Sequence, residues 1–130
     1  PASSQLTTRR NARYLAWRYG LPALGYRVFQ LGTDTAAGLT VFRLRKRGDS
    51  LVAAIVETLW PPGMVRSGRS LARVLRRSAA DYTISVGGPQ GIAGLRLPHS
   101  GPQLTGRTIS STTVPPIRNW SLTLGDIELF

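Results

Sequence analysis

A polar stretch within residues 61–77 holds the groups best suited to binding an anion. The segment reads PPGMVRSGRSLARVLRR and passes from a loop into an amphipathic helix after Ser67. Backbone amides from Ser67 to Leu71 could bind a phosphate at this helix start, and Gly68 would allow close approach. Arg66 and Arg69 flank the start, where the helix dipole disfavours a cation unless an anion lies nearby. These residues predict a phosphate site, although Ser-Gly-Arg-Ser is also an ordinary helix cap.

Other groups with chemical potential are few. Asp81, at the start of a predicted strand, suits a turn or a cap. The single histidine, His99, lies in a Pro-His-Ser-Gly loop, so we expect neither a Ser/His triad nor a histidine metal site. The absence of cysteine excludes disulfides and thiolate metal ligands. The sequence therefore predicts no metal site.

The composition is that of one compact domain with a basic surface. A chain of 130 residues with 42% hydrophobic residues is long enough to bury a core. Basic residues outnumber acidic ones by 17 to 6, which gives a net charge of +11. This balance suits nucleic acid, anionic lipid or phosphorylated ligands, while the predominance of arginine also fits GC-rich coding. No apolar run reaches the roughly 20 residues of a membrane span and no signal peptide is visible, so we expect a cytoplasmic protein with no membrane partner.

The first element that could position these groups is a helix ending near Tyr19. Thr7 or Thr8 would cap it and Gly20 would stop it. Its apolar stripe comprises Ala12, Leu15, Ala16 and Tyr19. We expect Tyr14 and Trp17 on the same helix to pack against a sheet.

The rest of the chain predicts an α/β fold with a mixed sheet. Strand-like runs at residues 25–32, 39–47 and 51–60 are joined by short turns that favour an antiparallel meander. The third run is apolar on both faces, which is typical of a central strand. The next helix has an arginine face, formed by Arg69, Arg73, Arg76 and Arg77, and an apolar stripe, formed by Leu71, Val74, Leu75, Ser78 and Ala79. A strand at residues 81–88 would then lie parallel to 51–60, and weaker strands are expected at 104–110 and within 121–130.

This order of elements and one motif resemble the GNAT N-acetyltransferase family. Residues 51–88 resemble its central strand–helix–strand unit, whose loop binds the pyrophosphate of acetyl-CoA through the pattern Arg/Gln-x-x-Gly-x-Gly/Ala. In the frame from Val65 to Ser70, Gly68 matches and Ser70 is a small substitute. Val65 departs from the first position, and Arg66 supplies a positive group one residue later.

A wider resemblance covers most of the chain. The runs RNARYLAWRYG, GYRVFQLG, GLTVFRLRKRG and ADYTISVGG look like the C-terminal lobe of large two-lobed bacterial GNAT-like proteins of the arginine-rich, actinobacterial type. The resemblance implies that residues 1–130 form a single acyltransferase domain or lobe of a longer chain. An N-terminal GNAT lobe, or self-association, would then complete the assembly.

The resemblance also implies a cofactor, an acceptor and a base. Acetyl-CoA would be held by Arg66, Ser67, Gly68, Arg69, Ser70 and Leu71, and the acceptor would be an amine. Glu57, on a strand where the family can place a base, is the candidate catalytic residue; ion pairing with an arginine is the other interpretation. The family's acid is commonly a tyrosine after the parallel strand, but no tyrosine follows Tyr82. We therefore expect a lobe that binds acetyl-CoA or completes the acceptor cleft, without independent catalysis.

The alternative function is a non-catalytic module that binds nucleic acid or another polyanion. Single-stranded nucleic acid is bound by aromatic side chains interleaved with basic ones. The first helix and its start offer such a mixture in Tyr14, Trp17 and Tyr19 with Arg10, Arg13 and Arg18. No recognised nucleic-acid motif accompanies them.

Overall fold

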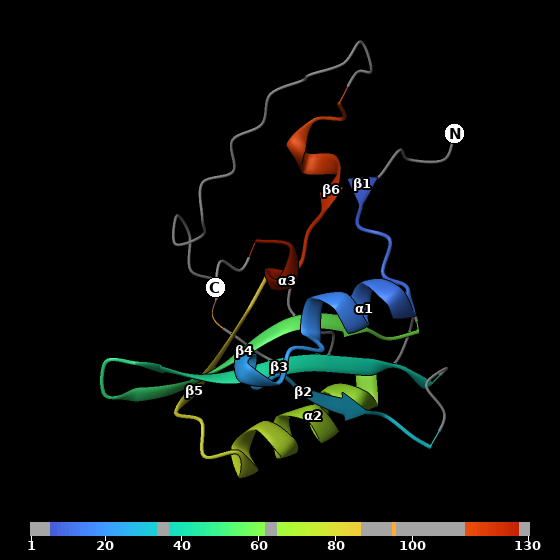
Figure 1. Cartoon of the computed structure of the whole chain (residues 1–130). Helices are drawn as coiled ribbons and strands as arrows, with labels where there is room; N and C mark the ends of the chain where they lie inside the picture. Colours follow the sequence, from blue (N-terminus) through green and yellow to red (C-terminus); the bar gives the residue numbers. More distant parts are fainter. Residues whose placement is uncertain (1–5, 34–36, 62–64, 87–94, 96–113, 128–130) are drawn as a thin grey trace.

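The structure, a computed structural model, has a mixed α and β architecture built on two sheets (Figure 1). It describes residues 6–33, 37–61, 65–86, 95 and 114–127. The elements are β1 (Leu6–Thr7), α1 (Ala12–Tyr19), the 3-10 helix η1 (Pro22–Leu24), β2 (Arg27–Gln30), β3 (Leu39–Arg47), β4 (Ser50–Leu59), α2 (Val65–Arg77), β5 (Tyr82–Ser85), the 3-10 helix η3 (Ile117–Asn119), β6 (Trp120–Ser121) and α3 (Leu124–Ile127). The general α/β class expected from the sequence is therefore confirmed.

The larger sheet has the strand order β2-β3-β4-β5. The pairs β2–β3 and β3–β4 are antiparallel, whereas β4 and β5, which flank α2 in the chain, are parallel. The predicted meander, the parallel strand and the interior position of the third strand are all confirmed. The first strand is shorter than expected because Gly25 takes a left-handed conformation (φ 62°) to end η1 before β2 begins.

A β-bulge in β4 decides which face Glu57 occupies. Phe42 pairs with Ile55, but its neighbour Val41 pairs with Glu57, so Val56 is an extra residue in β4. Directly paired residues share a face, and strict alternation from Ile55 would have placed Glu57 on the face that Ile55 occupies. The bulge instead turns Glu57 to the opposite face, which is the re-aiming effect such insertions have.

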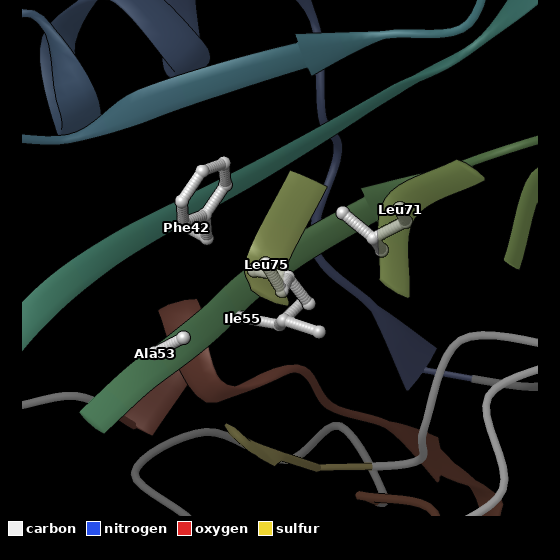
Figure 2. Packing of buried hydrophobic residues seen from close by; sticks show 5 residues of the cluster. All are labelled: Phe42, Ala53, Ile55, Leu71 and Leu75. Carbon is white, nitrogen blue, oxygen red and sulfur yellow. The ribbon is translucent and has the colours of Figure 1, made fainter. Parts of the chain in front are cut away.

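The hydrophobic core lies on the α2 face of this sheet. Leu71 and Leu75 of α2 pack against Phe42, Ala53 and Ile55 of β3 and β4 (Figure 2). The two leucines belong to the predicted apolar stripe, and all four predicted arginines of the other face are exposed. The helix begins at Val65, three residues earlier than expected. The helix α1 lies across the opposite face of the sheet (Figure 1).

The start and the packing of α1 differ from the sequence-based prediction. Asn11 is the cap, because its side chain accepts a hydrogen bond from the amide of Tyr14 at 2.9 Å; Thr7 lies in β1. Gly20 ends the helix as expected. Ala12 and Ala16 are exposed, and the helix has no fully buried residue, so the predicted apolar stripe contacts the protein only through its larger side chains.

Residues near the two ends of the described chain pair with each other. Leu6 and Thr7 pair in parallel with Trp120 and Ser121 to form the second, two-stranded sheet. The expected strand within residues 121–130 is wrong, since Leu124–Ile127 form the short helix α3, whose Gly125 lies against β4. The expected strand at 104–110 lies outside the described residues.

Candidate functional site

A buried network of charges links Arg10, Glu57 and Asp126 across three separate parts of the chain. Arg10 Nε donates to Glu57 Oε2 and Arg10 Nη2 donates to Asp126 Oδ2, each at 2.5 Å. Glu57 is 1% exposed, and the side chains of Arg10 and Asp126 are each 9% exposed. One guanidinium thus pairs with two buried carboxylates and offsets part of their charge.

The second oxygen of Glu57 is bound by α1. Tyr19, at the end of that helix, donates its hydroxyl to Glu57 Oε1 at 2.9 Å. The carboxylate therefore accepts one hydrogen bond on each oxygen and has almost no contact with solvent. The structure places this candidate base in the ion-paired arrangement that was the other interpretation of its sequence position.

Asp126 ties the C-terminal segment to the chain before α1. Its Oδ1 accepts from the Thr8 hydroxyl at 2.6 Å, and its Oδ2 accepts from the amide of Thr123 at 2.8 Å. Arg10 adds a bond to the Thr123 hydroxyl at 3.1 Å and another to the carbonyl of Thr8 at 3.0 Å. The hydrogen bonds of the network therefore connect the segment between β1 and α1, and the helix α3, to the bulged part of β4.

The surroundings of Arg10 and Asp126 favour the charged form of each side chain. Burial by itself would lower the pKa of Arg10, but Glu57 and then Asp126 outweigh it and hold that pKa above its usual value. Burial would raise the pKa of Asp126, yet the hydrogen bonds of Thr8 and Thr123 and the charge of Arg10 keep it below its usual value. Burial raises the pKa of Tyr19, and the charge of Glu57 raises it further.

Gly125 is packed so closely that no side chain fits there. A Cβ at this position would overlap the Tyr19 hydroxyl and lie 2.9 Å from both Glu57 Oε1 and the carbonyl oxygen of Val56. Arg18 holds the same residue from α1, donating Nε and Nη2 to the carbonyl of Gly125 at 3.2 and 3.0 Å. The glycine is required by close approach to the network.

The residues predicted to bind acetyl-CoA lie on the first two turns of α2, away from this network. Because the helix begins at Val65, the amides of Arg69, Ser70 and Leu71 fall within its hydrogen-bond ladder, and only those of the first turn, including Arg66 and Ser67, lack intrahelical partners. Arg69 and Ser70 are exposed and Gly68 is buried. The expectation of free amides as far as Leu71 is corrected, and the Leu71 side chain belongs to the core.

The outer side of α1 carries an open pocket of about 350 Å³. Its lining residues are Arg9, Asn11, Arg13, Tyr14 and Trp17. Trp17 is 75% exposed, so the expectation that it packs against a sheet is wrong. Tyr14 is half-buried and contacts both aromatic neighbours, with ring centroids 6.1 Å from Trp17 and 6.4 Å from Tyr19.

Sequence reasoning found Glu57 but missed the residues that hold it. Arg10 was considered only as a surface cation and Asp126 was not singled out, since 47 and 116 residues separate Arg10 from its two partners. One signal was present: a glutamate in an otherwise apolar central strand must find a cation. In the part of the chain that the structure describes, no group of three or more potential ligands is placed to hold a metal ion.

Comparison with known proteins identifies no relative. No family model matches the chain, and neither a curated protein nor a solved structure shows significant similarity to it. Among the described residues, the helices are too short and too polar to cross a bilayer.

Proposed function

We propose that this chain is a GNAT-type N-acyltransferase lobe that binds acetyl-CoA or completes the acceptor cleft of an N-acetyltransferase. The observation that carries the proposal is the parallel pair β4–β5 bridged by α2, with pairing that stops at Ile55 and Ser85 while β4 continues to Leu59. Beyond that point β4 has its bulge and its single carboxylate, Glu57. Where one strand extends beyond its parallel neighbour, its backbone groups are not paired with that neighbour. α/β proteins commonly bind ligands at this carboxyl end of the strands.

The state of Glu57 favours the cleft-completing role over independent catalysis. A general base must come within hydrogen-bond reach of the proton that it removes. Glu57 is buried, and Arg10 and Tyr19 occupy its two oxygens. We assign it a positioning role, holding α1 and α3 against β4, and expect the catalytic base to come from a partner lobe or a second copy.

The N-terminal turn of α2 is the proposed contact for the diphosphate of CoA. This turn contains no acidic residue, so its amides and dipole are not already neutralised from within the helix. Arg66 and Arg69 add positive charge at the end of the helix that already carries the positive pole. Both features favour an anionic ligand there.

A thermal-shift titration of the whole chain with acetyl-CoA tests this proposal. A ligand at about 100 times its Kd stabilises by about 2.7 kcal/mol, which corresponds to a Tm rise of about 10 °C for a domain of this size. Arg66→Ala with Arg69→Ala should abolish the rise. Arg73→Ala with Arg77→Ala removes the same charge from the same helix, further from its start, and should preserve it. No shift with either CoA or acetyl-CoA at millimolar concentration would refute the cofactor role, leaving only cleft completion to be tested with a partner lobe.

A further inference from the structure

The helix α1 has an inner side that contacts the rest of the protein and an outer side that is exposed to solvent. Arg18 and Tyr19 bind Gly125 and Glu57 on the inner side. Arg13 and Trp17, one turn apart and therefore neighbours on a helix surface, are both exposed. Arg13 and Trp17 remain free to meet a ligand, as does Arg9 just before the helix, whereas Arg10, Arg18 and Tyr19 are held by the fold.

The pocket beside Trp17 combines ring surface with polar donors. Its volume of about 350 Å³ lies at the lower end of the range for small-ligand sites, which mix aromatic walls with a few polar groups. Trp17 presents an uncovered indole. Asn11 uses its side-chain oxygen to cap α1, which leaves its amide NH₂ as a donor at the pocket. Burial and then the charge of Glu57 raise the pKa of Tyr14, and a hydrogen bond with Tyr19 engages its hydroxyl, so Tyr14 offers the pocket its ring.

The charge of the pocket is positive. Arg9 and Arg13 line it, and within the described ranges neither forms an ion pair, since both ion pairs found there belong to Arg10. Glu57 and Asp126, whose charges act on Tyr14, are both paired with that arginine. Two unpaired guanidinium groups beside an exposed indole suit a ligand that carries an anion next to a planar ring.

We propose that this pocket binds a nucleotide unit, with the phosphate held by Arg9 and Arg13 and the base stacked on Trp17. Stacking on an aromatic side chain tolerates any base, and arginine adds both charge and a planar donor. A free nucleotide and single-stranded nucleic acid both offer this unit. The proposal is independent of the acyltransferase function, because it uses no residue of α2.

Fluorescence anisotropy on the whole chain tests the proposal. The probes are a labelled ten-nucleotide oligothymidine, unlabelled thymidine monophosphate as competitor, and a ten-base-pair duplex, each at two salt concentrations. Binding of the oligomer with competition only at high mononucleotide excess identifies single-stranded nucleic acid as the source. If thymidine monophosphate and the oligothymidine bind with equal affinity per nucleotide, the ligand is a free nucleotide.

Two variants and one matched control define the site. Trp17→Ala removes an exposed side chain, so the fold should survive, and it should weaken binding of the oligomer at least fivefold. Arg9→Ala with Arg13→Ala should reduce the slope of log K against log salt by about 1.4. Arg73→Ala with Arg76→Ala removes two equally exposed charges from α2 and should change the affinity less than twofold.

Three results would overturn the proposal. The first is no binding of the labelled oligothymidine. The second is equal weakening by the α1 and α2 arginine pairs with no effect of Trp17→Ala, which would mean general charge attraction. The third is a change in sedimentation on Trp17→Ala, which would mean that a second copy covers the indole. Because CoA itself contains a nucleotide, loss of a CoA shift in Trp17→Ala but not in the Arg66/Arg69 variant would assign CoA to this pocket and refute the α2 site.

Discussion

Arg10 Nε lies 2.5 Å from Glu57 Oε2, and this contact joins the segment before α1 to the bulged part of the central strand. The same guanidinium reaches Asp126 near the other end of the described chain. Both carboxylates are buried, and Arg10 is the cation that each of them pairs with. The contact therefore holds α1 and the C-terminal segment against the face of the sheet opposite α2.

Removing one partner of this pair should be strongly destabilising. Arg10→Met leaves Glu57 and Asp126 buried without a cation, and breaking a buried pair in this way costs about 3–5 kcal/mol. Urea unfolding followed by circular dichroism measures the loss. Arg73→Met, the same change on the exposed face of α2, should alter the free energy of unfolding by less than about 0.5 kcal/mol. Similar values for the two variants would show that the pair contributes no more than a surface contact.

Gly125→Ala gives a sharper test, because helix propensity predicts that it stabilises the fold and packing predicts that it destabilises the fold. Within a helix, alanine is more favourable than glycine by about 1 kcal/mol. Here its Cβ would overlap the Tyr19 hydroxyl, so we expect the variant to lower the Tm. Tyr19→Phe removes that hydroxyl and should partly restore the Tm in the double variant. A Tm raised by Gly125→Ala alone would contradict the packing described for α3.

The longer strands and helices of this fold could be predicted from local sequence patterns, whereas the network of Arg10, Glu57 and Asp126 could not. The bounds of β3 match the expected run because Gly38 and Gly48 punctuate it, and Leu71 and Leu75 reveal the core side of α2 by their helical spacing. The bulge at Val56 adds one residue with no special composition, so no pattern marks it. That single residue decides the face of Glu57 and hence its pairing with Arg10.

The burial of the aromatic residues of α1 could not be predicted from local sequence either. Tyr14 and Trp17 resemble packing residues in any local reading, since aromatic side chains bury large areas. Whether they do so depends on which side of α1 meets the sheet, and Tyr19 decides that by reaching Glu57. The orientation of the helix is therefore set by a tertiary contact that the sequence of α1 does not contain.

Acid should weaken the fold through Asp126. The folded state lowers the pKa of this carboxyl, so its contribution to stability is present above its unfolded pKa of about 4 and is lost as the pH falls through the lower folded value. We expect the free energy of unfolding to fall with pH below about 4. Asp126→Asn should flatten this dependence, and Thr8→Val, which removes one stabilising hydrogen bond, should give an intermediate slope. An unchanged slope in Asp126→Asn would exclude this carboxyl as the source.

Leu71→Ala separates a structural role for this residue from the predicted role in the cofactor site. The side chain is 0% exposed and packs against β3 and β4, and deleting a buried leucine to alanine costs about 2–5 kcal/mol. Urea unfolding should therefore show a large loss for Leu71→Ala and a change below about 0.5 kcal/mol for Leu95→Ala, since Leu95 is 94% exposed. Because the Leu71 amide already belongs to the α2 ladder, the affinity for acetyl-CoA, measured below the Tm of the variant, should stay within twofold of that of the unmodified chain. A loss of affinity with unchanged stability would place Leu71 in a ligand site and contradict its position in the core.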